Sequence, residues 1–142
     1  MIIWLASYPK SGNTLLRSML TAYFYSKDGI FNFELLKNIN QFPNQTLFKN
    51  LGIDENNELE VIKNYIKVQE WINKRSGRSI NFIKTHSSLN DINGHRFTNL
   101  QNTLGVIYIV RDPRDIIRSY ANHSSISKEE AKNRILEIRT LG

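Results

Sequence analysis

The chain has 142 residues, of which 40% are hydrophobic and 23% are charged, and it contains no cysteine. This length fits a single domain, the composition excludes a wholly disordered or fibrous chain, and the lack of cysteine excludes disulfides, thiolate zinc sites and a cysteine nucleophile. Nineteen Lys and Arg against 13 Asp and Glu give a net charge of +6, which favours an anionic partner: nucleic acid, an anionic membrane or a phosphate-bearing small molecule.

The sequence contains neither a signal-peptide pattern nor a segment long and apolar enough to cross a membrane. Residues 1–10 lack the basic start and long apolar core of a signal peptide, and no stretch approaches the roughly 20 apolar residues of a membrane span. We therefore expect a soluble, cytoplasmic protein.

A strand is expected to open the fold, because residues 2–6 form an apolar run that Tyr8-Pro9 stops. From Asn13 onward apolar residues recur at helical spacing until residues 27–29 end the helix. The first part of the chain is thus a strand, a tight loop and a helix. Residues 31–57 show no sustained period, and we expect irregular structure there with one short helix.

The middle of the chain predicts one helix and two strands. Apolar residues at helical spacing over residues 59–72 indicate a second helix that ends near Ser76-Gly77. Residues 79–84 and 105–110 are rich in β-branched and aromatic residues, and we expect both to be buried strands. A polar loop joins them.

Two helices are expected to close the chain. Asp112 is placed to cap a helix with Pro113 in its first turn, and Ser127 with Glu130 forms a capping box for a last helix that runs to about Arg139. Strands that alternate with helices predict a single α/β domain with a parallel sheet.

The loop between the first strand and the first helix is the most informative segment. A helix N-terminus offers unpaired backbone amides and a positive dipole end to an anion; Lys10 adds a charge, and Ser11 and Thr14 add hydroxyl groups. The lysine precedes the glycine, unlike in G-x-x-x-x-G-K-[S/T], which weakens an ATPase or kinase interpretation. The alternative is a surface turn whose serine or asparagine caps a helix.

The other two strand ends carry similar chemistry. Arg111 follows the expected strand 105–110, at the sheet edge where ligands gather in α/β folds. Ser119 lies about two helical turns after Asp112 and can face the same side as that cap. An arginine and a serine at this place suit a phosphate monoester. The alternative is an ion pair of Arg111 with Asp112 or Asp115, with the serine on a solvated face. Lys84 and His86 lie where the second strand ends, and the histidine there is either a general base or an ordinary loop residue.

These three motifs, in this order over residues 2–123, resemble the sulfotransferases that use 3′-phosphoadenosine-5′-phosphosulfate (PAPS), particularly the cytosolic type. The resemblance implies a three-layer α/β/α fold with a central parallel sheet, like that of the P-loop nucleotide hydrolases. It also implies PAPS as sulfuryl donor, a hydroxyl or amine of a small molecule as acceptor, and no metal.

The resemblance also assigns roles to individual residues. Tyr8 to Leu15 is similar to the family's Y-P-K-S-G-T-T-W, which implies that Lys10 and the amides after it hold the 5′-phosphosulfate. Asn13 replaces one threonine, and Leu15 replaces the tryptophan that packs on the adenine. The cofactor-binding residues implied by the resemblance are Lys10, Ser11, Gly12, Asn13, Thr14, Leu15, Arg111 and Ser119, the last two at the 3′-phosphate.

Lys84-Thr85-His86 is similar to the family's K-[S/T]-H. This match implies that His86 is the base that deprotonates the acceptor, with Lys84 and Lys10 stabilising the transferring sulfuryl group. His95 and His123 lie outside the matched motifs. No His and carboxylate pair has the spacing of metal ligands.

Members of the family continue beyond this point with an R-K-G-x-x-G-x-x-K-like segment. We therefore expect residues 1–142 to be the cofactor-binding front half of a truncated domain, whose uncovered apolar surface pairs with a second copy or with a complementing chain. The alternative function is a catalytically inactive, nucleotide-binding remnant. A nucleic-acid binder rests on charge alone, without a recognised module. The acceptor stays open.

Overall fold

A three-stranded parallel sheet forms the centre of the computed structural model, which describes residues 1–77 and 79–137. Its strands are β1 (Ile2–Ser7), β2 (Asn81–Thr85) and β3 (Thr103–Ile109), in the order β2-β1-β3. Ile2 pairs with Asn81 on one side and with Thr103 on the other, so all three strands end at the same edge. The predicted parallel sheet is confirmed.

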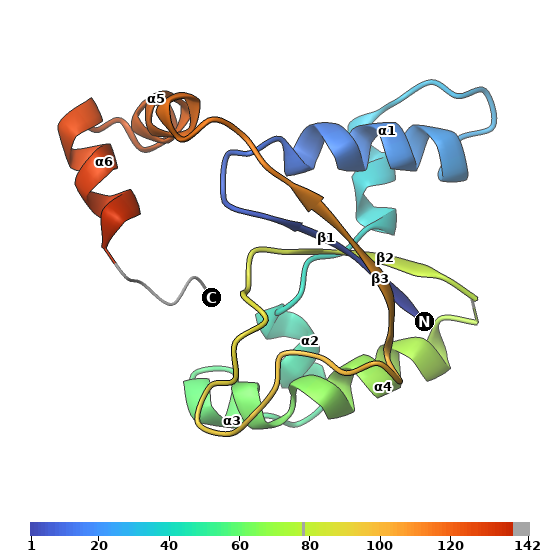
Figure 1. Ribbon diagram of the computed structural model, residues 1–142. Helices are drawn as coiled ribbons and strands as arrows, with labels where there is room; N and C mark the ends of the chain where they lie inside the picture. The colour runs from blue at the N-terminus through green and yellow to red at the C-terminus, as the bar shows by residue number, and fades with distance from the viewer. Residues whose placement is uncertain (78, 138–142) are drawn as a thin grey trace.

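Helices cover both faces of this sheet (Figure 1). One side carries α1 (Asn13–Tyr25), against which the 3₁₀ helix η1 (Phe33–Asn38) packs. The other side carries α2 (Gln45–Asn50), α3 (Glu58–Lys63) and α4 (Tyr65–Arg75). After β3 the chain continues into α5 (Pro113–Ser124) and α6 (Lys128–Leu136), which pack on each other beside the sheet. The expected three-layer α/β fold is confirmed.

The main core is aromatic and lies between the sheet and α2–α4. Trp4 of β1 is 1% exposed; its ring centroid is 4.9 Å from that of Phe97 and 5.7 Å from that of Phe42. Its indole nitrogen donates a 2.9 Å hydrogen bond to Thr103 Oγ1. Phe48 and Tyr65 complete the ring cluster.

A further backbone pairing extends the sheet beyond β2. The amide of Phe42 donates to the carbonyl oxygen of Lys84 at 2.9 Å. The amide of Lys84 donates to the carbonyl oxygen of Asn40, also at 2.9 Å. The segment 40–42 therefore runs parallel to β2 and places Gln41 beside Lys84.

The predicted helix over residues 59–72 is interrupted at Asn64. Asn64 ends α3, its side chain donates to the carbonyl oxygen of Glu60 at 2.8 Å, and α4 begins at the next residue. Residues 31–57 hold η1 and α2 instead of one short helix. Asn32 and Asn44 start these two segments by accepting hydrogen bonds from Leu35 N and Leu47 N.

The caps predicted for the last two helices are confirmed. Asp112 accepts from Arg114 N at 2.9 Å, and Ser127 Oγ accepts from Glu130 N at 3.1 Å. The predicted end near Arg139 lies outside the described residues. None of the helices in the described ranges is both long and apolar enough to cross a membrane.

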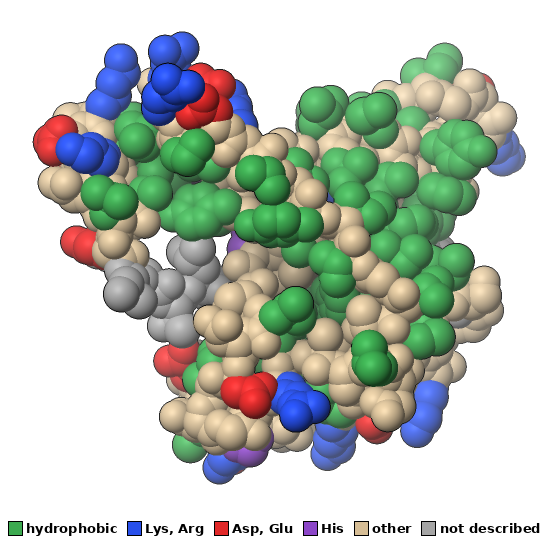
Figure 2. Space-filling model, in the orientation of Figure 1, with side chains coloured by type: hydrophobic (Ala, Val, Ile, Leu, Met, Phe, Trp, Pro, Cys, Tyr) green, Lys and Arg blue, Asp and Glu red, His purple; other side chains and the backbone are tan. Residues whose placement is uncertain are grey.

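The prediction that the third strand is buried is wrong. Among the described residues β3 is an edge strand with β1 as its one partner, and Leu104, Val106 and Tyr108 are 54%, 47% and 68% exposed. Figure 2 shows hydrophobic side chains gathered on this face, over the region of β3 and α1. The exposed members on α1 are Leu15, Met19, Tyr23 and Phe24.

Candidate functional site

The loop between β1 and α1 is a tight turn with two left-handed residues, Lys10 (φ 68°) and Gly12 (φ 107°). The amide of Ser11 closes it by donating to the carbonyl oxygen of Tyr8 at 3.3 Å. A left-handed lysine is strained, whereas glycine adopts this conformation at no steric cost. The turn brings the chain into α1 with Gly12 as its N-cap.

The N-terminus of α1 has neither a side-chain cap nor an acidic residue in its first turn. The other helical segments, except α4, are each capped by an Asn, Asp or Ser side chain. The first amides of α1 and the positive end of its dipole are thus available to an anion.

Lys84 and His86 stand at the end of β2. Lys84 Nζ donates a 2.9 Å hydrogen bond to Gln41 Oε1. Burial lowers the pKa of Lys84, and the nearby charge of Arg17 lowers it further. Nδ1 of His86 lies 2.6 Å from the carbonyl oxygen of Ser7. A carbonyl oxygen only accepts, so Nδ1 carries the proton and Nε2 holds the lone pair of the neutral ring.

Arg111 crosses from the end of β3 to the loop before α1. Its Nη1 donates to the carbonyl oxygen of Lys10 at 3.1 Å. The neighbouring Asp112 forms its ion pair with Arg114 instead, at 2.6 Å, and that arginine lowers the pKa of Asp112 to about 2. The alternative in which an aspartate neutralises Arg111 is therefore wrong for Asp112.

Most of the predicted site residues line one cavity of about 700 Å³. They are Lys10, Gly12, Asn13, Thr14, Lys84, His86, Arg111 and Ser119. Two predicted residues lie outside it: Ser11 is buried with no hydrogen-bond partner for its hydroxyl, and Leu15 is 67% exposed. The three strand ends meet here as the sequence predicts.

The charge around this cavity is one-sided. No Asp or Glu lines it, and Lys10, Lys84 and Arg111 form no ion pair with a carboxylate of the described residues. Some cations elsewhere are paired, for example Arg134 with Glu130 at 2.7 Å. Three cations without carboxylate partners beside a helix N-terminus are suited to a multiply charged anion.

The sequence interpretation missed four residues of this cavity: Pro9, Tyr120, His123 and Ser124. His123 lies four positions after Ser119, which is the spacing that puts two residues on one face of a helix. That spacing was the available signal for His123. The hydrogen bond between Ser7 and His86 could not be predicted from the sequence, because it depends on how β1 and β2 pair.

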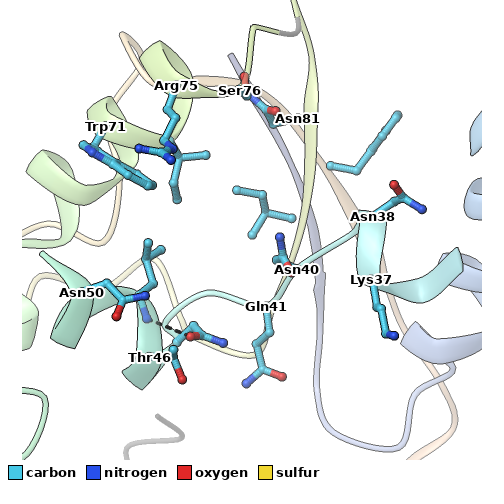
Figure 3. A pocket seen from close by; sticks show the side chains of 15 residues that line it. Lys37, Asn38, Asn40, Gln41, Thr46, Asn50, Trp71, Arg75, Ser76 and Asn81 are labelled. Carbon is cyan, nitrogen blue, oxygen red and sulfur yellow. Dashed lines mark hydrogen bonds between the residues drawn. The ribbon is translucent and has the colours of Figure 1, made fainter. Parts of the chain in front are cut away.

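A second cavity, of about 520 Å³, lies between β2, α2 and α4. Figure 3 shows Trp71 and Arg75 of α4 on one side of it, Asn50 and Thr46 of α2 on another, and Asn40 and Gln41 on the segment beside β2. None of the predicted site residues lines it. Gln41 connects the two cavities, since its side chain accepts the hydrogen bond from Lys84. Within the described ranges, no group of three or more His, Asp or Glu side chains is placed to hold a metal ion.

We predict that His86 titrates below pH 6.5. Burial lowers the pKa of His86 most and the charge of Lys84 lowers it further, against the opposing effect of the Ser7 carbonyl. The unfolded chain therefore binds a proton first as the pH falls, so this group contributes fully to stability above pH 6.5 and loses its contribution below it. NMR titration of the imidazole measures the midpoint.

The substitution Lys84→Met tests the electrostatic part of this prediction. Removing the nearby charge raises the pKa of His86 relative to the wild type, whereas Lys74→Met on α4 leaves it unchanged. A midpoint at or above pH 6.5 in the wild-type chain, or no change in Lys84→Met, would contradict the prediction.

Comparison with known proteins adds an independent finding to this geometry. The family model for the sulfotransferase domain matches residues 2–140. No curated protein and no solved structure matches the chain. The match covers almost all of the 142 residues, including β1, β2, β3 and the loops that meet at the cavity. The chain belongs to the sulfotransferase domain family.

Proposed function

We propose that this chain is a PAPS-dependent sulfotransferase that acts on a hydroxyl or amine of a small molecule. The observation that carries the proposal is the cluster of three cations without carboxylate partners around one cavity at the N-terminus of α1. PAPS, when bound, supplies the sulfuryl group, whose sulfur leaves the 5′-phosphate oxygen as the acceptor oxygen or nitrogen bonds to it.

The loop before α1 is suited to the 5′-phosphosulfate end. Lys10 supplies a positive charge, and the amides of Gly12 to Thr14 supply N–H donors in line with the helix dipole. Thr14 adds a hydroxyl group at the same place. These groups are fixed by the turn before any ligand arrives, which reduces the cost of orienting them.

Arg111 and Ser119 are suited to the 3′-phosphate. Nη1 of Arg111 holds the Lys10 carbonyl, and the other nitrogens of the guanidinium make no hydrogen bond with the described residues. Arg111 therefore joins the two ends of the anion site: it fixes the loop and offers further N–H donors. Ser119 and His123 of α5 line the same cavity.

His86 is proposed as the base. Its Nδ1 proton is directed at the Ser7 carbonyl, so Nε2 is the atom that takes the proton from the acceptor. Its lowered pKa keeps the ring neutral at neutral pH. Lys84, two residues earlier on β2, provides positive charge where negative charge builds up on the transferring group.

We expect the chain to bind adenosine 3′,5′-bisphosphate, and Arg111→Ala to weaken this binding about 10- to 150-fold, as for loss of a charge-assisted hydrogen bond of about 1.5–3 kcal/mol. Calorimetric titration measures the Kd. Arg114→Ala is the matched control: Arg114 is paired with Asp112 outside the cavity, and its loss leaves the Kd within about twofold, as expected for an exposed pair. No binding by the parent chain, or equal loss in both variants, would contradict the proposal.

We expect His86→Ala to lower sulfuryl transfer about 10²- to 10⁴-fold, the usual contribution of a general base, with binding of adenosine 3′,5′-bisphosphate retained. The assay follows transfer of labelled sulfate from PAPS to a panel of hydroxyl and amine acceptors. His95→Ala, outside the cavity, is the control. Binding without transfer by the parent chain would favour the alternative of a nucleotide-binding protein that does not catalyse.

The exposed face of α1 and β3 suggests self-association or pairing with another chain. An edge strand presents unpaired N–H and C=O groups, and here they stand beside exposed apolar side chains. We expect light scattering to give a mass above 16.6 kDa, and Val106→Lys on this edge to return it to the monomer value. A stable wild-type monomer would count against self-association.

A further inference from the structure

Gln41 forms a contact that joins the two cavities. It lines the second cavity (Figure 3), and its Oε1 accepts a 2.9 Å hydrogen bond from Nζ of Lys84, which lines the first. The orientation of the amide follows from this contact, because an ammonium group only donates and therefore faces the oxygen. A neutral side chain thus stands where an ion pair would place a carboxylate.

The backbone fixes Gln41 beside Lys84. The amide of Lys84 donates to the carbonyl oxygen of Asn40, and its own carbonyl oxygen accepts from the amide of Phe42, so Gln41 is the residue paired with Lys84. Ile39 and Phe42, which flank this pairing, are 0% and 1% exposed. Core packing of these two neighbours therefore places Gln41, independently of its side-chain contact with Lys84.

Arg17 of α1 anchors the same segment. Its Nη2 donates to the carbonyl oxygens of Leu36 at 3.0 Å and of Ile39 at 2.7 Å, where η1 ends. Burial lowers the pKa of Lys84 most, and the charge of Arg17 lowers it further. The charged form of Lys84 is thus disfavoured by its surroundings, and the oxygen of Gln41 acts in the opposite direction by accepting a hydrogen bond from that form.

The groups around Lys84 include no carboxylate. No Asp or Glu lines either cavity. The titratable and charged groups of the two cavities, with Arg17 beside them, are Lys10, Arg17, Lys37, Arg75, His86, Arg111, Tyr120 and His123. Within the described part of the chain, the acceptor for the Lys84 ammonium group is therefore the Gln41 amide.

We propose that Gln41 is a positioning residue for Lys84: its neutral oxygen holds the ammonium group at the first cavity and leaves the positive charge available to a bound anion. This inference rests on the proposed role of Lys84 at the transferring sulfuryl group. A carboxylate in the same place would also hold Lys84, but it would cancel most of the field of that charge at the anion. A hydrocarbon side chain would leave the charge and offer no acceptor.

The test compares two substitutions that each change one of these properties. Gln41→Glu keeps the shape of the side chain and adds a negative charge, so it raises the pKa of Lys84. Gln41→Met keeps the length and removes the accepting oxygen, so it lowers that pKa. NMR titration of the chain labelled with ¹³C-lysine measures both midpoints, and Lys84→Met assigns the signal. A merely structural change would not shift the two midpoints in opposite directions.

Gln45, four positions later on α2, provides the matched control. It lines neither cavity, so Gln45→Glu and Gln45→Met leave the midpoint of Lys84 nearly unchanged, because an exposed charge outside the site is screened by salt. Gln41 is itself exposed, and we expect its variants to fold. An unchanged midpoint in either Gln41 variant, shifts of both in one direction, or an equal shift in the Gln45 variants overturns the inference.

Calorimetric titration with adenosine 3′,5′-bisphosphate tests whether the charge is available to an anion. We expect Gln41→Glu to weaken binding about 5- to 30-fold, because the added carboxylate opposes the attraction of Lys84, and Gln41→Met to stay within about threefold of the wild type. Equal affinity of Gln41→Glu and the wild type would overturn this part of the inference. If the wild-type chain binds no nucleotide, the proposed function fails, while the NMR titration still decides whether Gln41 holds Lys84.

Discussion

The parallel pairing of β1 with β2 on one side and β3 on the other is the constraint on which the rest of the structure depends. Because the three strands run in the same direction, the loop before α1, the segment with Lys84 and His86, and Arg111 all emerge at one edge. The buried Trp4 holds the central strand in the aromatic core. Residues about 100 positions apart, such as Lys10 and Arg111, are then within hydrogen-bond distance.

The chemistry of the site depends on charged and polar groups at this sheet edge that lack partners within the described residues. Four surface cations are paired with acidic residues one helical turn away, whereas Lys10, Lys84 and Arg111 have no carboxylate partner among the described residues. The first turn of α1 is similarly left without a cap. Cations and amides held together in this way repel one another, and an anion relieves that repulsion. His86, whose pKa is lowered by burial, stands beside them and is the proton acceptor of the proposed transfer.

The sequence alone was sufficient to predict β1, α1 and the caps of α5 and α6, because each depends on a local pattern. The pattern is an apolar run for β1, helical spacing of apolar residues for α1, and a capping side chain, Asp112 or Ser127, for the last two helices. Burial of β3 could not be predicted, since the apolar run of residues 105–110 is the same for a central strand and for an edge strand. The break at Asn64 depends on one side chain bonding to Glu60. The sequence motifs predicted which residues gather at the site, but the side chain of Asn13 is directed at Ser7, a contact that only the packing of α1 on β1 determines.

The central claim is that the N-terminus of α1 and the ends of β2 and β3 form one anion site. The most direct measurement is amide chemical-shift mapping of ¹⁵N-labelled chain titrated with adenosine 3′,5′-bisphosphate. We predict saturable shifts that concentrate at Gly12 to Thr14, His86, Arg111 and Ser119, the groups that line the first cavity. Shifts that concentrate instead around Trp71, Arg75 and Asn50 in the second cavity, or no saturable shifts at all, would contradict the account.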